Sequence, residues 1–214
     1  MSKPKVPLIV GINGIAGAGK DTIANMVALS LERDSGYKVK CFAFADRLKQ
    51  ACSTLFKVPL EDFYDRKVKE TPNAFWNLSP RQMAQLMGTE ACRHGIRDDI
   101  WIKAIHQEIL ESGVDIAFIT DVRFDNEADY IHGVSYEIIN DHMIRHNSTP
   151  GIVVNITRTN QKLIQDSHHA SEKGITEHLK DFKIENVTGN PFAAAASLLQ
   201  IVMDALPHEE NTNE

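Results

Sequence analysis

The sequence predicts an α/β domain of three layers, in which a mainly parallel five-stranded sheet carries helices on both faces. Short apolar runs of strand length alternate along the chain with segments whose apolar residues recur at helical spacing. Strands separated by helices usually pair in parallel, and a parallel sheet is covered on both sides. A chain of 214 residues with 43% hydrophobic residues is long enough to bury such a core.

Ten segments show these patterns. The expected strands are residues 7–11, 38–44, 114–120, 152–157 and 182–187. The expected helices are residues 21–35, 45–56, 80–95, 100–111 and 192–206. The third helix begins with Ser79 as N-cap and Pro80 at the first helical position. Gly88 inside it costs up to about 1 kcal/mol relative to alanine, so we expect a neighbouring group to approach its backbone closely.

Three segments lack a clear pattern. Residues 61–71 are densely charged and fit a solvated helix or loop, and residues 124–151 form a polar link with surface histidines. Residues 160–179 fit a surface helix or a mobile lid. We therefore expect one domain over residues 1–206, with a helical region at about 45–112, a possible lid at about 159–180 and a flexible tail at 207–214.

A glycine-rich stretch joins the first strand to the first helix. It reads Gly14-Ile15-Ala16-Gly17-Ala18-Gly19-Lys20-Asp21-Thr22, with the spacing G-x-x-x-x-G-K of a phosphate-binding loop. Glycines let several backbone N–H groups converge on one anion, and the helix N-terminus adds partial positive charge. A glycine-rich turn without a ligand is the alternative. The order strand, loop, helix favours a nucleotide phosphate site and a P-loop NTPase fold.

Polar residues follow the other strands. Asp121 ends an apolar strand, which is typical of the second acidic motif of phosphate-loop proteins, and Arg123 and Glu127 follow it. Arg158 and Asn186 come at the ends of two later strands. Ligands of parallel α/β sheets bind beyond the carboxyl ends of the strands, so we expect these residues to gather at one edge.

Composition narrows the partners and the compartment. The net charge of −6, without a run of five or more like charges, makes a nucleic acid polymer an unlikely ligand. Three cysteines without a C-x-x-C pair fit reduced thiols in a cytoplasm, and no apolar stretch approaches the length of a membrane span. The histidines have no zinc-ligand spacing.

A phosphate loop alone leaves three functions open: a small-molecule kinase, a nucleotide-driven switch or ATPase, and a nucleotide-binding module without catalysis. A kinase needs further cations for a second phosphate group. The chain offers them near predicted strand ends and helix starts, at Lys49, Arg66, Lys69, Arg81, Arg93, Arg123 and Arg158. This supply favours the kinase.

The motifs together resemble those of the phage-type deoxynucleoside monophosphate kinases, over roughly residues 6–205. They are G-x-x-x-x-G-K-D-T, F-A-D-x-L-K, a K-E pair, R-Q-x-x-Q-x-x-G-T-E-x-x-R, D-x-x-W, D-V-R-F-x-N-E and a later H-x-S-E. The most specific are residues 81–93 and 120–127. The chain resembles dephospho-coenzyme A kinases and animal-type phosphomevalonate kinases more distantly.

The resemblance implies transfer of the γ-phosphoryl group of ATP to a deoxynucleoside 5′-monophosphate, with Mg²⁺. The implied donor-site residues are Gly14, Ala16, Gly17, Ala18, Gly19, Lys20, Asp21, Thr22 and Arg158, with the 169–172 segment near the lid and Asn186 against the adenine. The implied acceptor-site residues are Lys49, Arg66, Lys69, Arg81, Gln85, Gly88, Thr89, Trp101, Asp121, Arg123 and Glu127. Lys20, Arg93 and Arg123 are the expected catalytic residues, because guanidinium and ammonium groups stabilise charge on transferring phosphate.

Two features depart from the common pattern. Asp21 stands where Ser or Thr usually follows the lysine, so Asp21, Thr22 and Asp121 all remain candidates for Mg²⁺. Residues 135–150 form a longer link than the family usually has, which fits an elaborated subunit contact. The resemblance suggests a homodimer, and the accepted bases and the choice between deoxyribose and ribose stay open.

Overall fold

The computed structural model describes residues 7–139, 142–147, 151–159, 173–188 and 190–206. The chain divides into two compact units. Unit 1 comprises Met1–Cys41 and Ser112–Glu214, and unit 2 comprises Phe42–Glu111. Unit 2 covers nearly the same residues as the helical region expected from the sequence.

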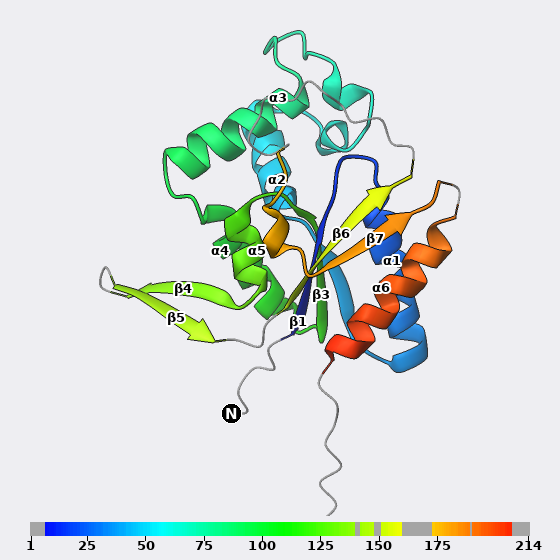
Figure 1. Cartoon of the computed structure of the whole chain (residues 1–214). Helices are drawn as coiled ribbons and strands as arrows, with labels where there is room; N and C mark the ends of the chain where they lie inside the picture. The colour runs from blue at the N-terminus through cyan, green and yellow to red at the C-terminus, as the bar shows by residue number, and fades with distance from the viewer. Residues whose placement is uncertain (1–6, 140–141, 148–150, 160–172, 189, 207–214) are drawn as a thin grey trace, which may run out of the picture. The chain divides into compact units, whose positions relative to one another are not determined.

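Unit 1 is built on a five-stranded sheet with the order β2-β3-β1-β6-β7 (Figure 1). β1 pairs in parallel with β3 and β6, and β6 pairs in parallel with β7. The strands are β1 (Leu8–Asn13), β2 (Val39–Phe42), β3 (Ile116–Val122), β6 (Ile152–Arg158) and β7 (Phe182–Asn186). The predicted sheet is confirmed, with its carboxyl ends at one edge.

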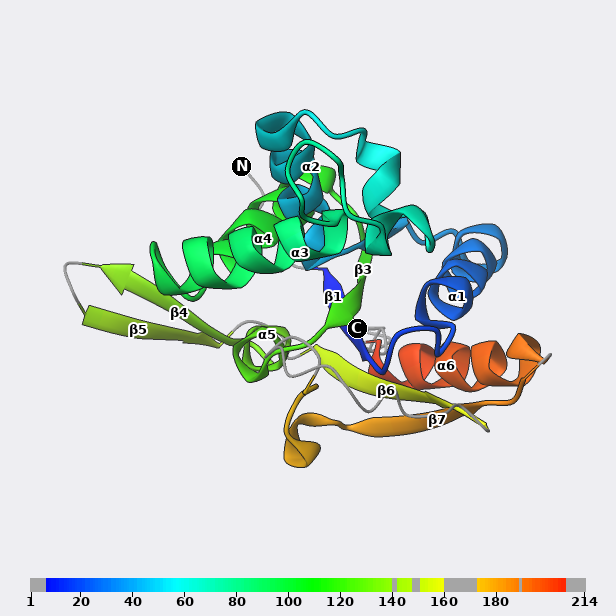
Figure 2. The same cartoon turned by 90° about the horizontal axis from the view of Figure 1, so that it is seen from above.

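Helices cover both faces of this sheet (Figure 2). On one face, α1 (Lys20–Ser35) and α6 (Pro191–Ala205) pack against each other and against the strands. On the opposite face lies α5 (Asp125–Ile131), which contacts β1 and β6. There a Cβ on Gly11 would lie 2.4 Å from the Ile131 side chain, so glycine allows α5 to approach β1. The three predicted layers are therefore present within unit 1.

Unit 2 is helical. It contains α2 (Phe44–Phe56), two 3₁₀ helices, η1 (Leu60–Phe63) and η2 (Val68–Glu70), then α3 (Pro80–Gln85), the π-helix η3 (Leu86–His94) and most of α4 (Ile100–Ser112). The predicted start of the third helix is confirmed, because the Ser79 hydroxyl accepts from the Gln82 N–H and the Gln82 side chain accepts from the Ser79 N–H. The charged segment 61–71 forms the two 3₁₀ helices.

The sequence does not predict the change from α to π geometry after Gln85. At this point the carbonyl oxygen of Gly88 accepts a hydrogen bond of 3.0 Å from Trp101 Nε1. A Cβ on Gly88 would also lie 2.5 Å from Leu48 Cδ2. The expectation that another group approaches the Gly88 backbone is therefore confirmed. π-helical turns often occur at functional sites.

A second difference concerns the segment after α5. The sequence predicts a polar link over residues 124–151, whereas the structure has α5 there, followed by an antiparallel hairpin of β4 (Val134–Ile139) and β5 (His142–Asn147). This hairpin extends away from the main sheet of unit 1 (Figures 1 and 2). Its residues lie in the stretch in which the resemblance suggests a subunit contact. Among the described residues, no helix is both long and apolar enough to cross a membrane.

Candidate active site

The loop after β1 has the backbone conformation that phosphate binding requires. Gly14, Gly17 and Gly19 have φ angles of 144°, 81° and 93°, in the region that favours glycine. A Cβ on Gly14 would lie 2.2 Å from the carbonyl oxygen of Ile156 in β6. Gly19 is the N-cap of α1 and uses no side chain for capping. The N–H groups of the first turn of α1 therefore have no side-chain cap, as an anion site needs.

Two side chains from other strands hold this loop. Asn186 at the end of β7 is 6% exposed, and its Nδ2 donates to the carbonyl oxygen of Ala18 at 2.7 Å. Arg158 at the end of β6 donates from Nη1 to the carbonyl oxygen of Gly17 at 3.2 Å. Both residues thus contact the glycine-rich loop, and their assignment to a donor site stays a prediction. The Asn186 amide serves the loop backbone, and its contact with adenine stays a prediction.

The loop borders a cavity of about 340 Å³ within unit 1. Four cationic side chains and no carboxylate line it among the described residues. The lining consists of Asn13, Gly14, Ile15, Ala16, Val122, Arg123, Asn155, Ile156, Thr157, Arg158, Lys173, Gly174 and Lys180. A cavity of this charge beside a phosphate loop suits an anion with several phosphate groups.

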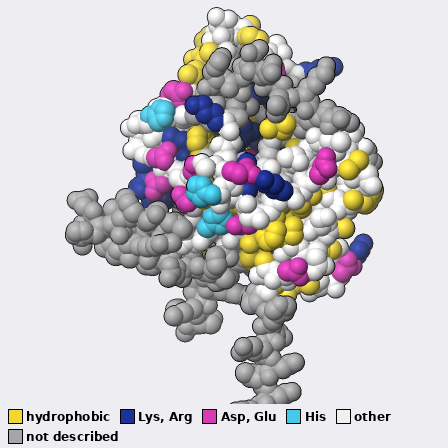
Figure 3. Space-filling view, viewed as in Figure 1, with side chains coloured by type: hydrophobic (Ala, Val, Ile, Leu, Met, Phe, Trp, Pro, Cys, Tyr) yellow, Lys and Arg dark blue, Asp and Glu magenta, His cyan; other side chains and the backbone are white. Residues whose placement is uncertain are grey.

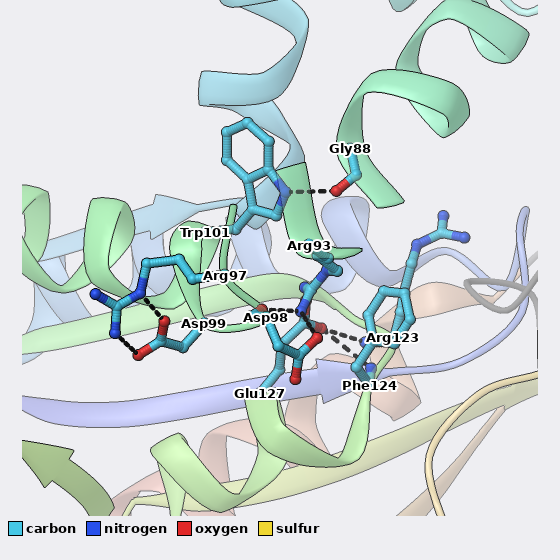
Figure 4. Close-up of polar contacts among 9 residues, drawn as sticks. All are labelled: Gly88, Arg93, Arg97, Asp98, Asp99, Trp101, Arg123, Phe124 and Glu127. Carbon is cyan, nitrogen blue, oxygen red and sulfur yellow. Dashed lines mark hydrogen bonds and ion pairs between the residues drawn. The ribbon is translucent and has the colours of Figure 1, made fainter. Parts of the chain in front are cut away.

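Arg123 reaches this cavity from the segment between β3 and α5. The carboxylate of Glu127, which is 2% exposed, accepts from the backbone N–H groups of Arg123 at 2.8 Å and Phe124 at 3.2 Å. Figure 4 shows the guanidinium of Arg123 pointing away from this carboxylate. The predicted cluster after β3 is thus present, with Glu127 bound to the backbone that carries Arg123.

The cavity residues that the sequence reasoning missed include two asparagines and two lysines: Asn13, Asn155, Lys173 and Lys180. The two asparagines are partners in the parallel register of β1 and β6, and both are buried. Each interrupts an otherwise apolar strand near its carboxyl end, which was a usable signal. The two lysines lie in the last part of the predicted lid segment (about 159–180), where the sequence has no periodicity to place them.

One contact ties the last part of the predicted lid segment to α5. The carboxylate of Asp125 accepts from the backbone N–H of Thr176 at 2.8 Å and from its hydroxyl at 2.6 Å. These hydrogen bonds lower the pKa of Asp125. They anchor the chain two residues after Gly174, which lines the cavity. Most of the predicted lid, including residues 169–172, lies outside the described residues.

In unit 2, two of the predicted acceptor-site cations, Lys49 and Arg81, lie close to carboxylates. Lys49 Nζ is 3.4 Å from the Asp46 carboxylate and 3.9 Å from the centroid of the Tyr64 ring. Arg81 forms an ion pair of 2.8 Å with Glu70, which lies in η2 next to Lys69. Arg66 is exposed in the preceding turn. The structure therefore brings Lys69 and Arg81 to neighbouring elements.

The other predicted residues of unit 2 lie on or beside the π-helix. Arg93 is 5% exposed, and its Nη1 donates to the Asp98 carbonyl oxygen at 2.8 Å (Figure 4). Thr89 is 6% exposed, Trp101 is 9% exposed, and Gln85 is half-buried. The indole N–H of Trp101 donates to the Gly88 carbonyl oxygen, so any contact of Trp101 with an acceptor would be made by the aromatic ring and not by this N–H.

The three candidates for a metal ion lie on two elements of unit 1. Asp21 and Thr22 are exposed in the first turn of α1, and Asp121 is half-buried in β3. Within the described residues no group of three His, Cys, Asp or Glu side chains is placed to hold a metal. Mg²⁺ in phosphoryl-transfer sites usually has one or two protein ligands besides phosphate oxygens and water, so these residues fit it.

Comparison with known proteins identifies the family. No family model matches the chain. It is 34% identical over 139 residues to a protein named putative deoxynucleotide monophosphate kinase from Acanthamoeba polyphaga mimivirus, covering 58% of this chain and 68% of that protein. It is 25% identical over 222 aligned positions to the deoxynucleoside-5′-monophosphate kinase of Escherichia phage T5, covering 78% and 85% of the two chains.

A solved structure of shikimate kinase from Acinetobacter baumannii in complex with shikimate matches 94% of this chain and 95% of its own. The TM-score is 0.41 at 13% identity, which is too low to support a conclusion. The sequence matches are sufficient by themselves. This chain belongs to the deoxynucleotide monophosphate kinase family.

Proposed function

We propose that the protein transfers the γ-phosphoryl group of ATP to a deoxynucleoside 5′-monophosphate, forming the diphosphate and ADP. The observation that carries this proposal is the cavity of unit 1, where the phosphate loop and four cationic side chains surround one volume. A site that only binds ATP phosphates is served by the loop and Lys20. The further cations, Arg123 above all, suit a second phosphate group next to the first.

The chain's own groups supply positioning and charge. The loop N–H groups and Lys20 bind the donor phosphates, and Arg158 donates to the loop carbonyl of Gly17 at 3.2 Å. Arg123 places a planar guanidinium in the cavity, where it stabilises the charge shared between donor and acceptor oxygens. Mg²⁺, held through Asp21, Thr22 or Asp121, neutralises charge on the β- and γ-phosphates when bound.

The acceptor contacts expected on unit 2 rest on the family resemblance. Arg81 and Lys49 have carboxylate partners in Glu70 and Asp46, and an incoming phosphate competes with these carboxylates for them. The substrates proposed are small molecules. Figure 3 shows Lys and Arg side chains interspersed with Asp and Glu on the face in view, in keeping with a ligand other than a nucleic acid polymer. A homodimer stays part of the proposal.

A panel of acceptors tests this function. The purified protein is mixed with ATP and Mg²⁺, and ADP formation is measured with each deoxynucleoside monophosphate, the ribonucleoside monophosphates, dephospho-coenzyme A and phosphomevalonate. We expect ADP to form rapidly only with deoxynucleoside monophosphates, and the set accepted defines the base specificity. ADP formation that no acceptor changes would instead indicate an ATPase or switch, and a response to either other acceptor would indicate a different small-molecule kinase.

A further inference from the structure

A single peptide group, the one between Val122 and Arg123, is held on both of its polar atoms by side chains. Its carbonyl oxygen accepts from Asn13 Nδ2 at 2.8 Å. Its N–H donates to Glu127 Oε2 at 2.8 Å. Asn13 ends β1 and Glu127 lies in α5, so two elements on different sides of the segment fix one peptide plane.

The peptide group lies at an irregularity in the sheet. Gly11 in β1 pairs with Ile119 in β3, and Asn13 pairs with Val122. The two pairs are thus two residues apart along β1 but three residues apart along β3. β3 therefore contains one extra residue here, as in a β-bulge, and the regular ladder of backbone hydrogen bonds is interrupted. The side chains of Asn13 and Glu127 bind the backbone at the point where strand pairing is irregular.

Burial makes these two hydrogen bonds effective constraints. Asn13 is 5% exposed and Glu127 is 2% exposed, so water competes little for their polar atoms. The bond to the carboxylate is of the stronger, charge-assisted kind. Because the plane of this peptide group sets the direction in which the Arg123 side chain leaves the backbone, the two bonds direct its guanidinium to the cavity that it lines.

We propose that Asn13 and Glu127 are positioning residues that act through Arg123, by clamping the peptide group that precedes its Cα atom. This inference rests on the proposed function, in which Arg123 contacts the transferring phosphate. It assigns Asn13 a role that the sequence does not suggest. It also gives Glu127 a role through the backbone of Arg123 in place of direct contact with the acceptor.

Kinetics in two backgrounds test the clamp. The single variants are Asn13→Ala, Glu127→Ala, Glu127→Gln and Arg123→Ala, with Asp129→Asn on α5 as the matched control. With ATP, Mg²⁺ and the best acceptor of the panel, we expect Asn13→Ala and Glu127→Ala to lower kcat/KM for the acceptor about 10- to 100-fold, as misplacement of a catalytic group does. Glu127→Gln keeps an oxygen acceptor and retains most activity.

The decisive comparison is made in the Arg123→Ala background. There we expect Asn13→Ala or Glu127→Ala to lower kcat/KM by no more than about twofold further, because the residue they position is gone. A loss as large as in the wild-type background would show that Asn13 or Glu127 acts on the substrate directly or on the fold as a whole, and would overturn the proposal.

Amide hydrogen exchange supplies a test that needs no turnover. We expect the N–H groups of Arg123 and Phe124 to exchange at least about 10-fold faster in Glu127→Ala, and the Arg123 N–H to exchange faster in Asn13→Ala, while amides of α1 keep their rates. Unchanged exchange at Arg123 in both variants would overturn the clamp. If the wild-type protein phosphorylates no acceptor, the proposed function fails, and the exchange rates still decide whether the clamp exists.

Discussion

Lys20 Nζ lies 2.7 Å from the carbonyl oxygen of Gly14, the residue that opens its own loop. The same nitrogen lies 3.1 Å from the carbonyl oxygen of Ile15. The lysine therefore folds back across the loop, and its charge lies beside residues that line the cavity. A phosphate bound by the loop N–H groups meets this ammonium directly, since a lysine in this position acts as a point charge.

Replacing Lys20 tests this arrangement. Lys20→Met keeps the length of the side chain and removes the charge, so we expect kcat/KM for ATP to fall by about 10²–10³-fold or more. The matched control is Lys103→Met, at an exposed position on α4. Steady-state kinetics with saturating acceptor measure both variants. Near-normal activity of Lys20→Met would mean that the loop is not the donor site.

Alanine substitution at two glycines with positive φ distinguishes the effect of steric crowding from that of backbone strain. A Cβ at Gly14 would lie 2.2 Å from a backbone oxygen of β6, whereas a Cβ at Gly36 would have open space around it. We expect Gly14→Ala to abolish measurable ATP binding, because the loop must move. Gly36→Ala should cost only the strain of the left-handed conformation, about 1 kcal/mol of unfolding free energy. Calorimetric titration with ATP and thermal unfolding compare them. Intact ATP affinity in Gly14→Ala would contradict the loop geometry.

Much of unit 1 was predictable because its signals are local. Residues Gly14 to Lys20 contain, at a fixed spacing, the glycines that shape the loop and the lysine expected to bind phosphate. Apolar strands that alternate with helices predict a parallel sheet. The sequence predicted that Asn186 and Arg158 lie at strand ends, but not that their side chains donate to the loop carbonyl oxygens. The bulge opposite Asn13 was not predictable, because register depends on pairing between strands that lie more than 100 residues apart in the chain.

Two tryptophans test the backbone contact in the π-helix. Trp101 Nε1 donates to the buried carbonyl oxygen of Gly88, and Trp76 Nε1 donates to the carbonyl oxygen of Phe56 at 2.8 Å from a site that is 40% exposed. Trp101→Phe leaves a buried acceptor without its donor, which costs about 1–3 kcal/mol of unfolding free energy. Trp76→Phe should cost less, since water can replace the donor. Urea denaturation of both variants measures the difference, and equal losses would show that Gly88 does not depend on Trp101.

The cysteines predict a pH dependence. All three are free thiols. Burial, with smaller contributions from the Asp21 and Glu32 carboxylates, raises the pKa of Cys41 to about 11, and burial raises the pKa of Cys52 to about 12. At pH 8 the folded protein should therefore react with iodoacetamide about 100-fold more slowly than the protein in guanidinium, read by mass spectrometry.

The raised pKa values of the thiols also determine the direction in which the free energy of unfolding changes with pH. The unfolded chain ionises its thiols near pH 8.5, below their pKa in the folded state, so the unfolded state binds fewer protons above that pH. The cysteine contribution to the unfolding free energy should therefore be constant below about pH 8 and decline as pH rises further. Replacing Cys41 and Cys52 with alanine should flatten the curve between pH 8 and 10. A decline of the same steepness in that variant would assign it to other groups.

Unit 2 shows where sequence reasoning ends. Ser79 and Pro80 predict the start of a helix through local capping, and this is confirmed. The π geometry after Gln85 comes with tertiary contacts, because Leu48 and Trp101 from two other helices approach Gly88, and such contacts are not visible in the sequence. The β4–β5 hairpin was also missed: β4 alternates between apolar and polar residues over Val134–Ile138, but β5 does not, and the segment was interpreted as a polar link.

The fate of the γ-phosphoryl group tests the central claim most directly. The protein is incubated with ATP labelled in the γ position, Mg²⁺ and a mixture of deoxynucleoside monophosphates, and the products are separated. Phosphoryl transfer predicts that the label appears in deoxynucleoside diphosphates, in amounts equal to the ADP formed, and that Lys20→Met abolishes both products. Label recovered only as inorganic phosphate, at a rate that the acceptors do not change, would contradict it.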